Sequence, residues 1–262
     1  MSEFEASLAR LETWLARHRL RAYEPYDALC SPLRPLFPGT LGRQVAIQIV
    51  RRSPFNLRPL LGIRPVTSAK SLGYFARAAF LRYETTAEGR HLDRGRRLLE
   101  RLIDAASPGW SGPCWGNHFD YQSRVFYQPK GEPTVVWTAL GGHALAHGYE
   151  VTGERRYLEA AAGACAFILR DLEWRDEGRL PVSYVPHTLR PSTTPTCWPP
   201  GCWRAVAAHG DAELRRRAVL AAAYICRLPA RGRLVVVRRG GEPALDRQLA
   251  HRVRARRAVA LH

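Results

Sequence analysis

The sequence predicts an all-α fold built from helical hairpins. Apolar residues recur at helical spacing along most of the chain, and no segment with the two-residue period of a strand occurs before residue 180. Three segments, which begin at Gly89, Gly153 and Gly210, also resemble one another: each opens with glycine and a turn and continues as an amphipathic helix. Because stacked helical hairpins bury one another's apolar faces, we expect a repeat architecture.

The first three expected helices lie in the N-terminal third of the chain. Residues 3–18, 42–51 and 68–84 each place apolar side chains on one helical face. Two proline-rich stretches, 22–38 and 52–65, separate these helices, since proline removes a backbone donor and interrupts a helix.

The middle of the chain combines a hairpin with a chemically rich loop. The helix expected at 134–151 runs directly into the segment that starts at Gly153, so the two should form a tight hairpin. The 25 residues before it, 109–133, contain six aromatic residues interleaved with polar and charged ones. Long loops of this composition usually carry function, and we expect the binding site there.

Four motifs resemble a known family: SPFNLRPLLGI (53–63), GWSGPCWGNHFDYQSR (109–124), PKGEPTVVWTALGGHAL (129–145) and YEVTGERRYLEAAAGACAFILRDL (149–172). In this order they are similar to bacterial proteins with a six-hairpin glycosidase-like fold, an α/α-hairpin toroid. Such proteins are often associated with polysaccharide biosynthesis or modification. The resemblance spans residues 5–187. It implies a toroid domain over residues 1–227 and a carbohydrate as substrate or ligand.

The C-terminal region breaks the hairpin pattern. Four prolines within residues 188–204 forbid the helix that the repeat requires before Gly210. The stretch Cys-Trp-Pro-Pro-Gly-Cys-Trp can be encoded so that a shifted frame reads Leu-Leu-Ala-Ala-Arg-Leu-Leu, an ordinary helix. Our hypothesis is that residues 188–204 and the Arg-rich tail 228–262 are frame-shifted. The toroid would then be incomplete, with an irregular tail, and resequencing the gene tests this.

The positive charge is concentrated in that tail. The formal charge of +17 divides into +6 over residues 1–187 and +11 over residues 188–262. Nearly all basic residues are arginine, the only lysines being Lys70 and Lys130, a bias typical of GC-rich coding. We therefore do not expect a nucleic-acid partner.

The sequence also argues against a membrane span and favours free thiols over a disulfide framework. No run of 18 uncharged apolar residues occurs, and the N-terminus lacks the pattern of a signal peptide, so we expect a cytoplasmic protein. Six cysteines without a CxxC pair favour free thiols. His143 and His147 share a helix face, but no glutamate follows His143 as in zinc proteases, so we expect no metal and no cofactor.

Asp120 and His118 are the candidate catalytic residues. Asp120 would act as an acid, with Asp27 or Glu132 as the second carboxylate that glycoside hydrolysis requires. His118 would act as a general base, because its pKa lies near neutral pH. For Asp120, His118 and the loop aromatics, purely structural roles remain open.

The remaining candidates are expected to bind substrate, through ring stacking or through hydrogen bonds to hydroxyl and carboxylate groups. They are Tyr26, Asp27, Arg52, Asn56, Arg58, Trp115, Asn117, Tyr121, Gln122, Arg124, Lys130 and Tyr184. His187 could line the same cleft. Two functions remain: a carbohydrate-active enzyme (glycoside hydrolase, lyase or epimerase), or a non-catalytic glycan-binding or scaffold protein in polysaccharide biosynthesis.

Overall fold

The computed structural model describes residues 3–124, 126–173, 183–186, 210–213 and 215–216, and this part of the chain is mostly helical. Its α-helices are α1 (Glu3–His18), α2 (Gly39–Arg52), α3 (Ala69–Thr86), α4 (Gly89–Asp104), α5 (Val135–Thr152) and α6 (Arg155–Arg170). Two short 3-10 helices, η1 (Asp27–Cys30) and η2 (Arg34–Leu36), precede α2. The helical prediction is confirmed for these residues. The expectations for 188–204, 228–262 and His187 lie outside them.

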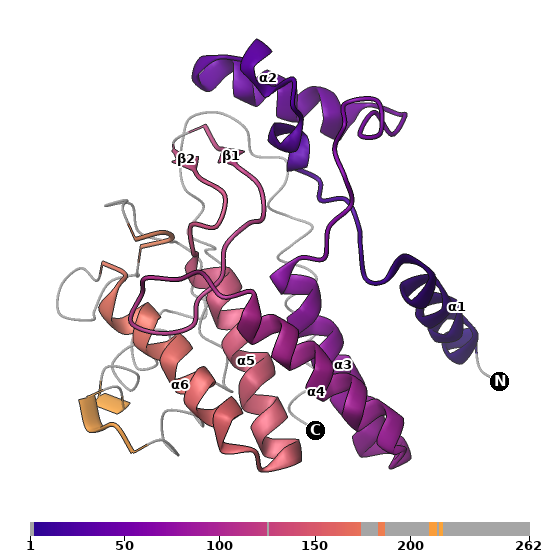
Figure 1. Ribbon diagram of the computed structural model, residues 1–262, viewed down its shortest axis with the longest axis vertical. Helices are drawn as coiled ribbons and strands as arrows, with labels where there is room; N and C mark the ends of the chain where they lie inside the picture. The colour runs from indigo at the N-terminus through magenta and orange to yellow at the C-terminus, as the bar shows by residue number, and fades with distance from the viewer. Residues whose placement is uncertain (1–2, 125, 174–182, 187–209, 214, 217–262) are drawn as a thin grey trace, which may run out of the picture.

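Two helical hairpins, α3–α4 and α5–α6, form the body of the molecule (Figure 1). Both of their tight turns lie at one end of the helices, whereas the loops on either side of β1–β2 and the segment that carries α2 lie beyond the other end. Gly153 ends α5 with a φ of +71°, in the left-handed region where glycine is favoured. The predicted turn between the second pair of helices is therefore confirmed.

The main core lies between these four helices. Phe80 of α3, Leu99 and Leu102 of α4, Leu145 of α5 and Tyr157 of α6 are all essentially inaccessible to solvent. The helices approach closely at Gly148, where an added Cβ would lie 2.3 Å from Leu99 Cδ1. Small residues at such crossings let the backbones come together, and the large side chains fill the space on either side.

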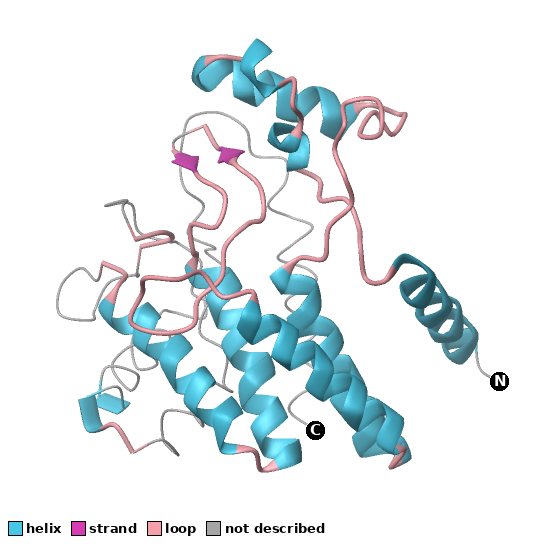
Figure 2. Ribbon diagram, viewed as in Figure 1, coloured by secondary structure: helices cyan, strands magenta, loops and turns pink. Residues whose placement is uncertain are grey.

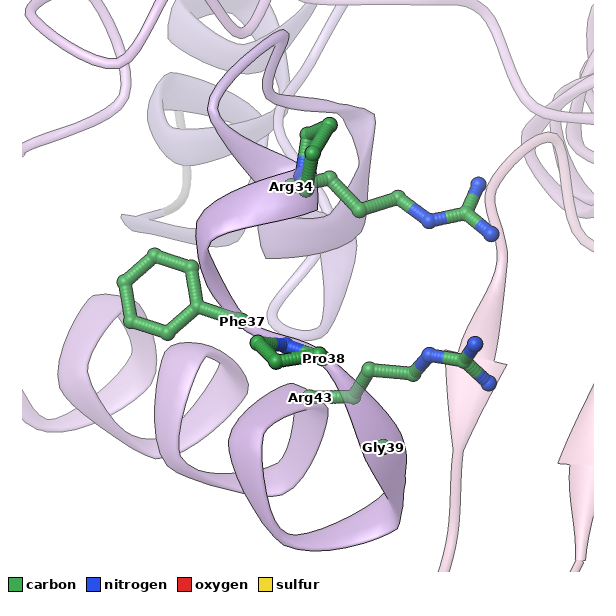
Figure 3. A pocket seen from close by; sticks show the side chains of 6 residues that line it. Arg34, Phe37, Pro38, Gly39 and Arg43 are labelled. Carbon is green, nitrogen blue, oxygen red and sulfur yellow. The ribbon is translucent and has the colours of Figure 1, made fainter.

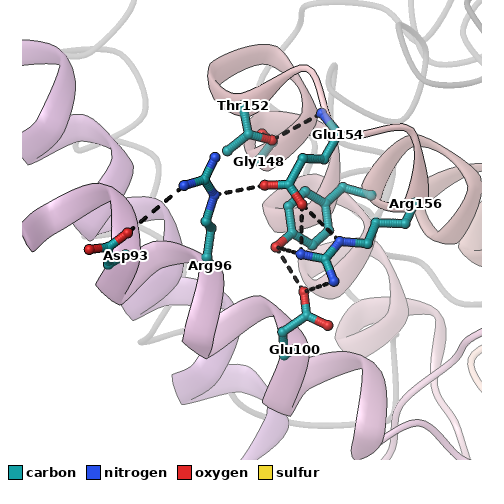
Figure 4. Close-up of polar contacts among 8 residues, drawn as sticks. Asp93, Arg96, Glu100, Gly148, Thr152, Glu154 and Arg156 are labelled. Atoms are coloured by element: carbon teal, nitrogen blue, oxygen red, sulfur yellow. Dashed lines mark hydrogen bonds and ion pairs between the residues drawn. The ribbon is translucent and has the colours of Figure 1, made fainter. Parts of the chain in front are cut away.

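An ion-pair network also links α4 to the start of α6 (Figure 4). Arg96 Nε donates to Glu154 at 2.7 Å, Arg156 Nε donates to the same carboxylate at 2.8 Å, and the Tyr157 hydroxyl donates to Glu100 at 2.8 Å. Burial opposes ionisation of Glu154, but hydrogen bonds from Arg156 and Arg96 outweigh it and lower the pKa of this carboxyl group. Since most members are partly exposed, the network orients the helices more than it stabilises them.

A second apolar cluster joins the N-terminal segments to the long loop. Ala28 and Leu29 of η1 pack against Ala46, Ile47 and Val50 of α2. Tyr26, Phe37, Leu61 and Tyr121 complete this cluster. It fixes the segment between α1 and α3 against the loop that carries the candidate catalytic residues.

That loop contains a short hairpin that the sequence did not predict (Figure 2). Strands β1 (Tyr121–Gln122) and β2 (Tyr127–Gln128) pair antiparallel, with Tyr121 opposite Gln128. Our expectation of no strand before residue 180 was therefore wrong for these four residues. Strands of two residues are too short to show a recognisable period.

Candidate functional site

Side chains from three separate segments, two of them charged, meet at the first turns of α3 and α5. Lys70, in the first turn of α3, places Nζ 3.1 Å from Glu24 Oε2. The same ammonium lies over the ring of Trp137 in the first turn of α5, 5.1 Å from the ring centroid. Ser68 and Thr134 cap the two helices by accepting from backbone N–H groups three residues on, which fixes where each helix begins.

Asp27 and Arg58 form a buried ion pair beside Glu24. Arg58 Nε donates to Asp27 Oδ1 at 2.8 Å, and the side chains are 14% and 3% exposed respectively. The second Asp27 oxygen accepts from the backbone N–H of Glu24, and Arg58 also donates to the Glu24 carbonyl. Every bond of this pair therefore fixes the 24–27 turn. Asp27 is therefore a structural carboxylate.

His118 lies within electrostatic range of Glu24, Asp27 and both lysines of the chain. Its pKa is lowered by burial, is raised by Glu24 and Asp27, and is lowered again by Lys130 and Lys70. Its Nδ1 atom is buried and has no hydrogen-bond partner among the described residues. We name Glu24, Asp27, Arg58, Lys70 and His118 the His118 cluster. Because the pKa of His118 is lowered, its imidazole is neutral at neutral pH.

Asp120 has a different environment, in which its contacts join two parts of the loop and tie the loop to η2. It forms an ion pair with Arg34 and accepts from the backbone N–H of Lys130 at 2.8 Å. The Tyr127 hydroxyl is hydrogen-bonded to the same carboxylate and accepts from Arg34 Nη2 at 3.0 Å. These contacts give Asp120 a structural part in holding the loop.

Most of the aromatic and amide candidates of the loop are buried. Trp115 is 1% exposed and donates its indole N–H to the carbonyl of Leu102 at 2.7 Å, so its ring has no face open to a ligand. Asn117 donates to Gln128, and Gln122 donates to the carbonyls of Ser123 and Phe126. These contacts support loop packing rather than direct contact with a sugar.

The other predicted binding residues divide between the loop and its neighbours. Tyr121 is partly buried against Tyr26, whose ring lies 5.5 Å away, and Arg51 lies over the Tyr26 ring. Tyr184 accepts from the backbone N–H of Val135 at 3.0 Å through its carbonyl, so its ring is held beside the start of α5. Arg124 and Lys130 are exposed on the loop surface.

Arg52 and Asn56 take no part in the contacts of the His118 cluster described above. Arg52 is exposed at the end of α2, where it lines a hollow of about 490 Å³ with Leu41, Val45 and Ile49. Asn56 is exposed, and its side chain accepts from the backbone N–H of Arg58 at 3.3 Å, as a turn residue does. The structure thus brings Arg58, but not these two, into the cluster.

Sequence reasoning did not select Glu24 or Lys70 as site residues, yet one signal pointed to them. In a chain whose other basic residues are all arginine, both lysines act on the pKa of His118. GC-rich coding favours arginine over lysine. The two lysines that occur despite this bias were therefore the basic residues to consider as site candidates. Glu24 then follows as the partner of Lys70.

His143 and His147 lie on α5, apart from these contacts. His147 Nε2 lies 3.4 Å from Glu84 Oε2. Burial, assisted by Arg77 and His147, lowers the pKa of His143 to about 4. No group of three or more His, Cys, Asp or Glu side chains in the described ranges could hold a metal ion. Cys30, Cys114 and Cys165 form no disulfide bond among the described residues.

The lowered pKa of His143 predicts a loss of stability in acid. Because the folded pKa of about 4 lies below the ordinary 6.5, unfolding takes up a proton between these values. Stability is therefore complete above about pH 6.5 and falls as the pH drops toward 4, by about 2 kcal/mol after allowance for partial solvent exposure. Urea unfolding at the two ends of this range measures the loss. His143→Gln should reduce it, and an equal loss in that variant would contradict the assignment.

No helix in the described part of the chain is long and apolar enough to cross a membrane.

The sequence matches no protein-family model and no curated protein. Among solved structures, the chain is similar to cellobiose 2-epimerase from Bacillus thermoamylovorans B4167, with a TM-score of 0.44 and 12% sequence identity. The alignment covers 76% of this chain and 56% of that chain, so this protein spans little more than half the length of the epimerase. The likeness is weak, and no activity follows from it.

Proposed function

We propose that this chain acts on a carbohydrate, and that His118 is the base that removes a proton from a sugar carbon. The observation that carries the proposal is the state of His118: a neutral imidazole with an unpartnered buried nitrogen, in the field of two lysines and two carboxylates. The carbohydrate class rests on the four motifs that resemble the six-hairpin glycosidase-like family. In this proposal α3–α4 and α5–α6 are successive hairpins of an α/α toroid.

The geometry favours an epimerase or a lyase over a glycoside hydrolase. Both of the favoured reactions begin when a base takes a proton from a carbon next to a carbonyl or carboxylate, and the electron pair moves onto oxygen. The ammonium groups of Lys70 and Lys130 would stabilise that negative oxygen. Hydrolysis instead needs two working carboxyl groups, whereas Asp27 and Asp120 are both held in ion pairs.

Deuterium exchange tests the proposal directly. The protein is incubated in D₂O with neutral disaccharides and with oligosaccharides of uronic acids, and loss of the ring C–H signal is followed by proton NMR. We expect exchange, or formation of an unsaturated product, with at least one sugar. His118→Gln should slow it by about 100-fold or more, since general bases contribute factors of this size. His18→Gln, on α1, is the matched control.

Three results would contradict this assignment. Equal rates in wild type and His118→Gln would remove His118 from the reaction. Bond cleavage that is lost in Asp120→Asn but kept in His118→Gln would assign the protein to glycoside hydrolysis. Glycan binding without exchange would favour the second candidate, a non-catalytic glycan-binding protein.

A further inference from the structure

A hollow of about 430 Å³ lies between η2 and the start of α2, and none of its residues was a sequence-based candidate. It is lined by Arg34, Pro35, Phe37, Pro38, Gly39 and Arg43. Figure 3 shows the guanidinium groups of Arg34 and Arg43 extending side by side in the same direction, while the Phe37 ring points away from them. One side of the hollow is therefore cationic and the rest is apolar.

The two arginines are held in place by the loop that carries His118. Arg34 pairs with Asp120 and donates to the Tyr127 hydroxyl, and the Arg43 guanidinium lies over the Tyr127 ring at 4.5 Å from its centroid. Burial and the hydrogen bond to Asp120 raise the pKa of Tyr127, so the phenol stays neutral. Asp120 offsets the charge of one guanidinium, and no carboxylate among the described residues forms an ion pair with Arg43.

The N-terminus of α2 adds to this positive potential. Pro38 occupies the N-cap position, and no side chain caps the helix. The first backbone N–H groups of a helix have no partner within it, and they carry the positive end of the helix dipole. A Cβ added at Gly39 would meet no atom within 4 Å, so this end of the helix is open.

We propose that this hollow binds the anionic group of a sugar, either the carboxylate of a uronic acid or the phosphate of a sugar ester. Arginine suits both groups because its planar fork can donate two parallel hydrogen bonds to one anion. The proline side chains beside the guanidinium groups would contact the apolar C–H face of the ring. The sugar part rests on the proposed function, whereas anion recognition depends only on the charges of the hollow.

Position connects the hollow with the His118 cluster. Asp120 binds Arg34 on one side and the backbone of Lys130 on the other, and Lys130 acts on the pKa of His118. A glycan that placed its charged residue in the hollow would therefore extend toward the loop that carries the base. The hollow would select acidic glycans over neutral ones and hold them for the reaction.

Isothermal titration calorimetry on the full chain tests this with four probes: glucuronic acid, glucose 6-phosphate, glucose and inorganic phosphate. We expect at least one of the two acidic sugars to bind about tenfold or more tightly than glucose, with affinity that falls as salt is raised. Arg43→Gln should remove most of this preference, and Arg43→Lys should retain part of it. Arg64→Gln, at an exposed position with the same change in charge, should leave it intact.

The outcomes distinguish a site for a carboxylate, a site for a phosphate, and the absence of an anion site. Tighter binding of glucuronic acid assigns a carboxylate site, and tighter binding of glucose 6-phosphate assigns a phosphate site. If inorganic phosphate binds as tightly as glucose 6-phosphate, the hollow is an anion site that does not recognise the sugar ring. Equal affinity for glucose and both acidic sugars, or equal losses in Arg43→Gln and Arg64→Gln, overturns the inference. Deuterium exchange that depends on His118 could still be observed in that case. Failure of the anion site and failure of the proposed function are therefore distinguishable.

Discussion

Replacing Trp115 with alanine is expected to lower the free energy of unfolding by about 3–5 kcal/mol, the usual cost of truncating a buried tryptophan. The side chain is 1% exposed and lies in the main core beside Gly141, where an added Cβ would approach the indole ring to 2.5 Å. Truncation would leave a cavity in the core. It would also leave the Leu102 carbonyl without the indole donor. Urea unfolding followed by circular dichroism measures the change.

Trp14 provides the matched comparison, since it is 44% exposed on α1. Trp14→Ala should change stability by less than about 1 kcal/mol, as is usual for surface positions. A Trp115→Ala variant with wild-type stability and lost glycan binding would show instead that this ring stacks on a sugar, as the sequence alone suggested.

Replacing Asp27 with alanine should destabilise the protein by a similar amount, about 3–5 kcal/mol, because it leaves the charge of Arg58 buried without a partner. The change also removes the acceptor for the backbone N–H of Glu24, so the turn that presents Glu24 to Lys70 should loosen. Unfolding free energy measures the first effect. Faster amide hydrogen exchange at residues 24–27 measures the second.

Two further variants distinguish loss of the Asp27–Arg58 ion pair from the loss of a negative charge alone. Asp93→Ala removes a carboxylate that is 60% exposed and should have little effect. The double variant Asp27→Leu with Arg58→Met replaces the pair with apolar side chains and should recover part of the stability. If Asp27→Ala were as stable as Asp93→Ala, the pair could not be the element that fixes this turn.

The helices were largely predictable because their signals are local. The first helix has the expected bounds, and α5 and α6 meet at Thr152 and Gly153 as the sequence indicated. Amphipathic spacing and a glycine in the left-handed region depend only on residues a few positions apart. The β1–β2 hairpin was missed because each strand has only two residues.

The site was less predictable because its contacts join distant segments. Asp120 meets Arg34, which lies 86 residues away, and Lys70 meets Glu24 across 46 residues. Sequence also does not reveal burial within a loop: Trp115 looked like an exposed ring in a polar stretch, but it packs in the core. The sequence offered His118 only as a possible general base, and that role stays a prediction; its nearness to Glu24 and Asp27 became visible only in the structure.

The pair of lysines has a practical consequence for labelling chemistry. Amine-selective acylating reagents do not modify arginine, so Lys70 and Lys130 are the only side chains of this sequence that they can modify. Both lysines act on His118, and Lys70 is 36% exposed. Mass spectrometry of an acylated sample would therefore report the occupancy of one small region directly. A ligand that shields the two ε-amino groups would be detected as protection, without any variant of the protein.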